Sequence, residues 1–219
     1  VAYALGPAYF TPVSPAELPL AGLRFTLVGP GSVGQSLAAW IVARGGRLSQ
    51  LAGRPGSASV QAFARRSGVP GVETRQLATR GEELLLIAVP DGELDGIASL
   101  LAQRPQAAVA LHVSGVAGAA VLAPLRAAGS AIGGFHPLRA FPTPEAGVEE
   151  ASGLFFALDG DPPAIELGRR LATAFGATAA EIPAGQRPIY HLVATLMAGE
   201  RAVVKAAKTC AQSRSNIDV

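Results

Sequence analysis

The chain has 219 residues, of which 49% are hydrophobic, so it can bury a sizeable core in one or two domains. Its formal net charge is only +2, with 18 basic residues against 16 acidic ones, and aromatic residues make up 5%. This balance argues against a nucleic-acid-binding protein, which would show a basic patch or an aromatic stacking surface. No apolar run reaches the roughly 18–20 residues that a membrane-spanning helix requires.

The single cysteine, Cys210, cannot form a disulfide within the chain, which fits a protein of the reducing cytoplasm. Residues 1–21 contain four prolines and no basic stretch ahead of an apolar core, so a secretory signal is not expected. We predict an N-terminal extension over residues 1–21, a dinucleotide-binding domain over residues 22–184 and a helical segment over residues 185–219.

Residues 24–38 carry the most informative pattern of the chain. A short predicted strand over residues 25–28 is followed by a Gly-x-Gly-x-x-Gly turn and then by apolar residues at helical spacing. In a dinucleotide-binding βαβ unit the first glycine permits a tight turn, the second lets a pyrophosphate approach the backbone, and the third lets the helix pack on the strand. The helix N-terminus offers N–H groups to the phosphates. We predict that the dinucleotide is held by Gly29, Pro30, Gly31, Ser32, Val33 and Gly34, the alternative being a purely structural turn.

The next predicted strand, over residues 48–52, lacks the acid that usually binds the adenosine ribose in such folds. No Asp or Glu occurs between Glu17 and Glu73, whereas Arg54 and Ser57 follow the strand. A guanidinium matches the oxygens of a 2′-phosphate, so the sequence favours NADP, with NAD possible, and Arg54 as the main discriminator. The alternative is that Arg54 is a solvated loop charge.

The rest of the chain alternates strands and helices, which indicates an open, doubly wound, mostly parallel α/β sheet. The run of six apolar residues over 84–89 is typical of a strand buried on both faces of such a sheet. Pro124 is expected to kink or shorten one of the helices. The other expected strands cover residues 72–77, 109–113, 131–135, 153–158 and 177–182, and the expected helices cover residues 57–67, 91–101, 119–128 and 162–175.

Ligands of such a sheet bind beyond the carboxyl ends of the strands. Val89, Pro90 and Ser114 fall there, and we predict that they line the nicotinamide end of the cofactor. His136 ends another predicted strand, and because an imidazole titrates near neutrality it is a candidate acid or base. The alternatives are that Ser114 caps a loop and that His136 shapes the pocket floor through a bond to a loop carbonyl.

From residue 185 the pattern changes to an apolar helix that contains Tyr190 and His191. Adjacent residues diverge by about 100° on a helix, so we expect only one of these side chains to face the cleft. We predict that it is His191, which joins His136 and Ser114 as the third catalytic candidate, whereas His112 is expected in the core. No metal site is predicted, because the chain has no paired cysteines and no His-Glu-x-x-His spacing.

Several of these segments together resemble a group of bacterial Rossmann-type proteins related to pyrroline-5-carboxylate reductase and the deazaflavin-linked NADP reductases. The Ser-Gly and Phe-His-Pro-Leu segments narrow the resemblance to a subfamily with a C-terminal helical domain of unknown function. It implies a Rossmann-type sheet that holds NAD(P), a substrate cleft between two domains, and a homodimer if the helical region is complete. The matching segments are residues 27–34, 87–91, 112–115, 134–138, 141–142 and 190–191.

We therefore predict an NADP-dependent oxidoreductase that transfers hydride to or from a small carbonyl, imine or hydroxy compound. The competing hypothesis is a non-catalytic NADP(H)-binding sensor or regulatory protein, favoured by the missing Lys or Tyr-x-x-x-Lys type proton donor and by the short helical end. The expected partner is a small-molecule substrate, with no nucleic acid and no membrane. Residues 201–219 lose the apolar register, so we expect the helical segment to be truncated relative to the family pattern.

Overall fold

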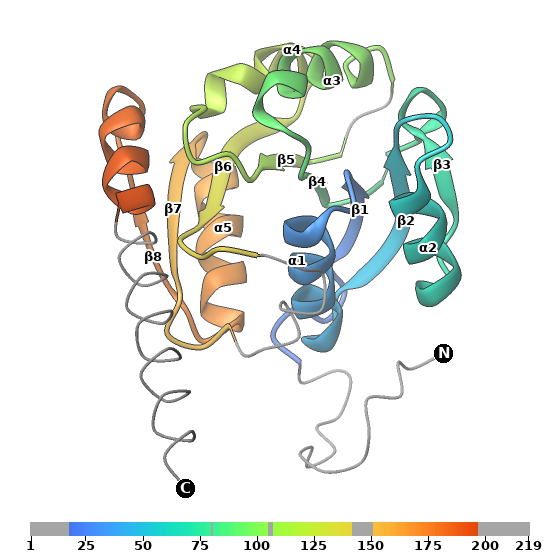
Figure 1. Cartoon of the computed structure of the whole chain (residues 1–219), viewed down its shortest axis with the longest axis horizontal. Helices are drawn as coiled ribbons and strands as arrows, with labels where there is room; N and C mark the ends of the chain where they lie inside the picture. The colour runs from blue at the N-terminus through green and yellow to red at the C-terminus, as the bar shows by residue number, and fades with distance from the viewer. Residues whose placement is uncertain (1–17, 80, 105–106, 142–150, 197–219) are drawn as a thin grey trace, which may run out of the picture.

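The computed structural model describes residues 18–79, 81–104, 107–141 and 151–196. One eight-stranded sheet runs through the protein, with strand order β3-β2-β1-β4-β5-β6-β7-β8 (Figure 1). Neighbouring strands are parallel except β6 and β7, which pair antiparallel. Helices pack on both faces of this sheet. The prediction of a doubly wound, mostly parallel α/β fold is confirmed.

The elements follow the predicted alternation of strands and helices. In chain order they are β1 (Arg24–Val28), α1 (Ser32–Ala43), β2 (Arg47–Gly53), α2 (Ala58–Ser67), β3 (Gly71–Glu73), η2 (Thr74–Gln76), β4 (Leu84–Ile87), η3 (Asp91–Glu93), α3 (Leu94–Leu101), β5 (Val109–His112), η4 (Ala119–Leu122), α4 (Ala123–Ala127), β6 (Ala131–Pro137), β7 (Phe155–Gly160), α5 (Pro162–Ala174), β8 (Thr178–Glu181) and η6 (Ala184–Gln186).

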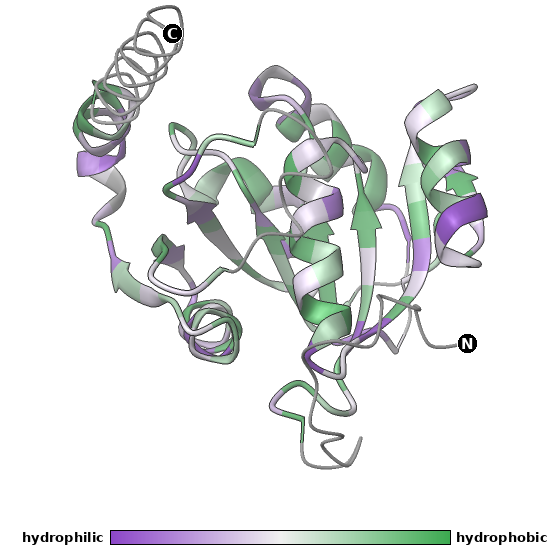
Figure 2. Ribbon diagram, turned by 60° about the horizontal axis from the view of Figure 1, so that its bottom comes forward, coloured by the Kyte–Doolittle hydropathy of each residue, from purple (hydrophilic) through white to green (hydrophobic). Residues whose placement is uncertain are grey.

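The core consists of two apolar layers, one on each face of the sheet. On one face α1 and α5 pack together, and Trp40 of α1 lies 5.6 Å from the ring of Phe175. On the other face α3, η4 and α4 cover the sheet. The central strand β4 is buried at every position because it is covered on both faces, which explains its continuous apolar sequence. Figure 2 shows this hydrophobic character along the central strands and along α1.

Several expected elements differ from the structure. The helix expected over residues 91–101 is divided into η3 and α3. The strand expected over residues 72–77 ends at Glu73, because the chain turns there into η2, a 3-10 turn whose ends are joined by the side chains of Glu73 and Gln76. The helix expected over residues 119–128 is divided into η4 and α4. Pro124 lies in the first turn of α4, where its missing N–H costs no helical hydrogen bond, so the proline starts a new helix.

Beyond β8 and η6 the chain forms a helix over residues 187–196, which lies beside β7 and β8 (Figure 1). Among the helices of the described ranges, none is long and apolar enough to cross a membrane. Residues 1–17 and 197–219, including Cys210, and Pro142 of the family pattern lie outside the described residues. The boundaries after residues 21 and 184 stay predictions.

Candidate functional site

The glycine turn follows β1 at the switch point of the sheet. β1 pairs with β2 on one side and with β4 on the other, so a crevice is expected beyond its carboxyl end. Gly29 has φ +83°, and a Cβ there would lie 2.5 Å from the carbonyl oxygen of Ala88. A Cβ at Gly34 would lie 2.5 Å from the carbonyl oxygen of Gly29. The fold itself therefore requires glycine at both positions.

Gly31 differs from the other two glycines of the turn. Its φ is −75°, which any residue adopts, and a Cβ there would meet nothing within 4 Å. Internal packing therefore gives no reason for glycine at this position, whereas a ligand lying close to the backbone would. No side chain caps α1, and its first turn contains no acid that would repel an anion. The turn thus fits a pyrophosphate held by the backbone N–H groups of Ser32, Val33 and Gly34.

The turn is held in place by Gln35, a residue that the sequence analysis did not single out. Its side-chain Nε2 donates to the carbonyl oxygen of Pro30 at 2.7 Å, and its Oε1 accepts from the guanidinium of Arg66 on α2. The Gln35 side chain is buried. The glycine turn is therefore fixed by a polar contact between α1 and α2 and is ordered before any ligand arrives.

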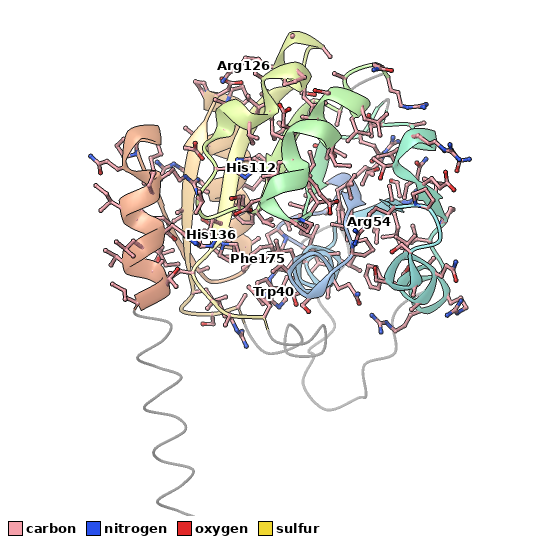
Figure 3. The ribbon with its side chains drawn as sticks, turned by 45° about the horizontal axis from the view of Figure 1, so that its top comes forward. Trp40, Arg54, His112, Arg126, His136 and Phe175 are labelled. Atoms are coloured by element: carbon pink, nitrogen blue, oxygen red, sulfur yellow. The ribbon has the colours of Figure 1, made fainter. Side chains whose placement is uncertain are left out.

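Arg54 lies just beyond the carboxyl end of β2, where an adenosine ribose would be expected. Its side chain is 78% exposed, and its Nη1 lies 3.6 Å from Oε1 of Glu93 in η3. The structure thus supplies an acid at this position from a distant part of the chain. The predicted partner Ser57 is the N-cap of α2, and its hydroxyl accepts from the Val60 N–H at 3.4 Å. In Figure 3 Arg54 lies well apart from His112 and His136.

A cluster of ring side chains lies at the carboxyl ends of β5 and β6. The Nδ1 of His136 is 3.0 Å from the hydroxyl of Tyr190, and the ring centroids of His136 and His191 are 6.0 Å apart. Gly115 lies beneath, where a Cβ would collide with both imidazoles. That only one of Tyr190 and His191 faces the cleft, and that it is His191, stays a prediction. Both approach His136, because a ring lying across the helix can contact two long side chains that diverge by about 100°.

Arg187 anchors the helix over residues 187–196 to the sheet. Its side chain is fully buried and donates to the carboxylate of Asp159 on β7 and, through Nη1 at 3.2 Å, to the carbonyl oxygen of Ser114. Asp159 Oδ2 in turn accepts from the Ala119 N–H at 2.7 Å. Sequence reasoning missed this pair, for which the only signal was an acid inside an apolar strand.

Residues 10–137, more than half of the chain, match the Rossmann-like domain family. The chain belongs to the Rossmann-like domain family. Comparison with curated proteins finds no match. The fold is similar to those of solved structures, three of which are described below. The sequence identities are low, so these comparisons show a shared fold and nothing more.

A Bacteroides fragilis protein, provisionally named an NADP oxidoreductase, has a TM-score of 0.70 at 16% identity, over 90% of this chain and 74% of that one. A Thermotoga maritima protein has a TM-score of 0.62 at 19% identity, over 89% and 70%. Plasmodium falciparum pyrroline carboxylate reductase, solved with NADP bound, has a TM-score of 0.56 at 14% identity, over 90% and 71%. The resemblance to the pyrroline-5-carboxylate reductase group is therefore confirmed at the level of the fold.

In this Rossmann-like domain His136 does not titrate near neutrality, as the sequence suggested it would, and neither does His112. Burial lowers the pKa of His136 to about 4, helped by the positive charge of Arg187. Burial also lowers the pKa of His112 to about 4. His112 is fully buried, as predicted, and its Nδ1 accepts from the Ser114 N–H at 3.2 Å. Burial raises the pKa of the Tyr190 hydroxyl. His112 and His136 are therefore neutral at physiological pH.

Ser114 serves the loop that follows β5. Its hydroxyl accepts from the N–H groups of Val116 at 3.2 Å and Ala117 at 2.9 Å, which confirms the loop-capping interpretation. The hydroxyl hydrogen still permits a bond to a ligand. In the part of the chain that the structure describes, no group of three or more His, Cys, Asp or Glu side chains is placed to hold a metal ion.

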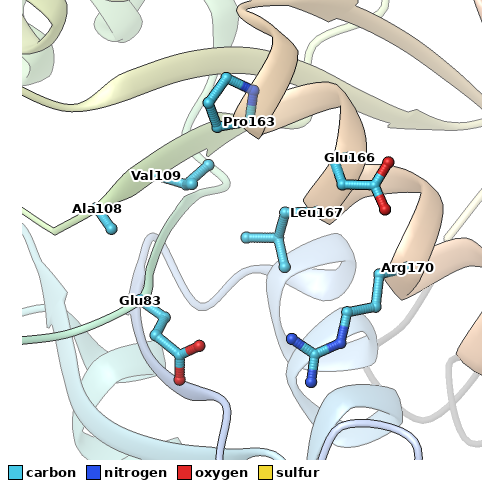
Figure 4. Close-up of a pocket in the computed structure, with 7 residues that line it drawn as sticks. All are labelled: Glu83, Ala108, Val109, Pro163, Glu166, Leu167 and Arg170. Atoms are coloured by element: carbon cyan, nitrogen blue, oxygen red, sulfur yellow. The ribbon is translucent and has the colours of Figure 1, made fainter.

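A cavity of about 290 Å³ opens between α5 and the residues that precede β4 and β5 (Figure 4). This is the amino edge of the parallel strands, opposite the glycine turn, so the cavity is not part of the dinucleotide crevice. It is lined by Glu83, Ala108, Val109, Pro163, Glu166, Leu167 and Arg170.

We expect Gly31→Ala to weaken NADPH binding by about tenfold or more, which corresponds to about 1.4 kcal/mol, while the free energy of unfolding stays within about 1 kcal/mol of wild type. The reason is that its Cβ would project only into the space proposed for the pyrophosphate. Gly34→Ala is the matched control: it should lower the melting temperature, because its Cβ meets backbone. Calorimetric titration and thermal unfolding measure the two effects. If Gly31→Ala binds NADPH with wild-type affinity, the pyrophosphate does not bind at this turn.

Proposed function

We propose that this protein binds NADP(H) at the glycine turn and transfers hydride to or from a small carbonyl, imine or hydroxy compound. The observation that carries the proposal is the open space above Gly31, beside the uncapped N-terminus of α1. The similar folds of a protein named as an NADP oxidoreductase and of a reductase solved with NADP support the same conclusion.

In this proposal the turn from Gly29 to Gly34 holds the pyrophosphate, and Val89, Pro90 and Ser114 line the nicotinamide end. The side chain of Val89 lies against Gly29, since a Cβ there would be 2.8 Å from Val89 Cγ1. His136 and His191 border the space in which a substrate would meet the nicotinamide. When bound, the cofactor supplies or accepts the hydride. The neutral imidazole of His136 can orient a neighbouring hydroxyl or a substrate polar group.

Calorimetric titration of the purified chain with NADPH and NADH is the first test. Tight binding of NADPH with weak binding of NADH would support both the glycine turn and Arg54. Equal binding would keep the turn and remove the argument for the 2′-phosphate. Binding of neither cofactor would refute the proposed function.

We propose that the preference for NADP rests on the Arg54 guanidinium, which attracts the 2′-phosphate, and that the nearby Glu93 carboxylate weakens it. We expect Arg54→Ala to weaken NADPH binding by about tenfold and to leave NADH binding nearly unchanged, because one charge-assisted contact to the 2′-phosphate is lost. Glu93→Gln should strengthen NADPH binding, since the carboxylate 3.6 Å from Arg54 would repel the phosphate. Arg65→Ala, which changes an exposed arginine of α2, is the control. An unchanged ratio of NADPH to NADH affinity in Arg54→Ala would make Arg54 a solvated loop charge.

A second candidate function is an NADP(H)-binding sensor without turnover. It is favoured by the polar groups at the carboxyl edge, which bond to other groups of the protein: the Ser114 hydroxyl caps its loop, and Arg187 is paired with Asp159. A panel of small carbonyl compounds and cyclic imines separates the two candidates. Consumption of NADPH with any of them supports the oxidoreductase, whereas tight binding without consumption supports the sensor.

We also propose that the helix over residues 187–196 mediates a homodimer. Four large apolar side chains of this helix are exposed: Ile189, Leu192, Val193 and Leu196. An exposed apolar face of this kind typically marks a protein interface. Light scattering of the full chain would show a mass of twice the monomer.

The single cysteine supports a reducing, cytoplasmic location.

A further inference from the structure

The hydroxyl of Tyr190 lies at the carboxyl edge of the sheet, although its backbone belongs to the helix over residues 187–196. It is 3.0 Å from Nδ1 of His136 in β6, and the two rings meet edge to face at 87°. The loop after β5, where Gly115 packs against the His136 ring, borders the same point. The carboxyl edge is also where the nicotinamide of the proposed cofactor would lie.

Arg187 fixes the position of Tyr190. The two residues are at i and i+3, so they share one face of the helix. The guanidinium of Arg187 is fully buried and bonded to Asp159 and to the carbonyl oxygen of Ser114. The buried ion pair holds the first turn of the helix in place, and the contact with His136 then orients the Tyr190 side chain. The Tyr190 hydroxyl is therefore pre-positioned against His136.

The surroundings keep the Tyr190 hydroxyl protonated and its imidazole partner neutral. Burial raises the pKa of Tyr190, which the charge of Arg187 partly offsets. Burial lowers the pKa of His136, and the charges of Arg187 and His191 act in the same direction, whereas Asp91 opposes them. His112 of β5 also lowers the pKa of His136, and Asp159 of β7 is paired with Arg187. A neutral imidazole can either accept from the phenol or donate to it.

We propose that Tyr190 is the acid–base residue of the proposed hydride transfer and that His136 is the positioning residue that holds its hydroxyl. This inference rests on the proposed function. In the reducing direction, hydride adds to the carbonyl or imine carbon, and the π electron pair moves to the oxygen or nitrogen. That atom takes the proton of the Tyr190 hydroxyl. The two electrons of the hydride would be supplied by the reduced cofactor, and a water molecule returns a proton to Tyr190. The Nδ1–H tautomer of His136 stabilises the phenolate meanwhile.

The test compares the ionisation of Tyr190 in the full chain with NADP⁺ bound and with NADPH bound. Tyrosinate absorbance is followed against pH, and Tyr190→Phe is the blank that removes the signals of Tyr3 and Tyr9. Because the oxidised nicotinamide ring is positively charged, a hydroxyl beside it should have its pKa lowered by about one pH unit or more relative to the NADPH complex. An equal Tyr190 pKa in the two complexes would overturn the acid–base assignment and leave Tyr190 a packing residue.

The positioning role of His136 needs a separate variant. His136→Leu should raise the pKa of Tyr190 in the NADP⁺ complex, because the phenolate loses its donor, and His136→Gln should restore part of the effect through its amide. If the Tyr190 pKa is the same in both variants as in the wild type, His136 does not position the hydroxyl. If calorimetry shows that neither cofactor binds, the proposed function itself fails, together with the inference. Binding of both cofactors with an insensitive Tyr190 refutes the inference alone.

Once a substrate is found in the panel, Tyr190→Phe should lower kcat by about 100-fold or more, with little change in the Kd for NADPH. Thermal unfolding of the variant checks that the fold is retained. Undiminished kcat in Tyr190→Phe would overturn the proposal, because a residue that only packs would not be needed for proton transfer.

Discussion

Asp159→Leu is expected to lower the free energy of unfolding by about 3–5 kcal/mol, because it leaves the guanidinium of Arg187 buried without its counter-charge. Arg187 is fully buried and Asp159 nearly so, and Arg187 is the first residue of the helix over residues 187–196. The loss should therefore also detach that helix from β7. Urea unfolding, followed by circular dichroism at neutral pH, measures the change.

Two further variants separate the buried charge from other effects. Asp159→Leu combined with Arg187→Leu should recover part of the lost stability, because no uncompensated charge remains. Recovery should be incomplete, since the Ala119 N–H still loses its acceptor, at a cost of about 1–3 kcal/mol. Arg169→Leu breaks an exposed pair with Glu181 and should cost less than about 1 kcal/mol. A cost for Asp159→Leu no larger than that of Arg169→Leu would contradict the proposed anchoring of the helix.

Acidification should destabilise the fold well before the carboxylates are protonated. The pKa values of His112 and His136 are lowered from 6.5 to about 4 in the folded protein, so the unfolded chain binds more protons between these values. Their contribution to stability is fully present above pH 6.5 and is lost as the pH falls towards about 4. Each histidine should contribute on the order of 3 kcal/mol.

Urea unfolding at a series of pH values tests this expectation, with His136→Gln as the matched variant. Glutamine does not titrate, so the variant should keep the slope due to His112 and lose the slope due to His136. A stability that is flat between pH 6.5 and about 4 would show that the two histidines are protonated as readily in the folded protein as in the unfolded chain.

The fold and the glycine turn could be predicted from the sequence because both depend on local patterns. The alternation of buried strands and amphipathic helices specifies a parallel sheet wherever it occurs. The roles predicted for Gly29 and Gly34 agree with the contacts that a Cβ would make at each position, and Gly31 has the open surroundings that its role needs. Pro124 was expected to kink or shorten its helix, and the helix is divided there, because proline lacks the N–H that an uninterrupted helix requires.

The arrangement around His136 depends on contacts between segments that are distant in the chain. The sequence placed His136 at a strand end. It could not show that Tyr190 contacts His136 or that Arg187, paired with Asp159, lies near it, because these residues come from a later helix and strand. Likewise, the pairing of Arg54 with Glu93 joins β2 to the turn after β4. Burial sets the protonation state of these histidines, because it lowers the pKa of an imidazole and keeps the ring neutral at physiological pH. Backbone propensity and periodicity act within a few residues, whereas burial and charge pairing are properties of the assembled fold.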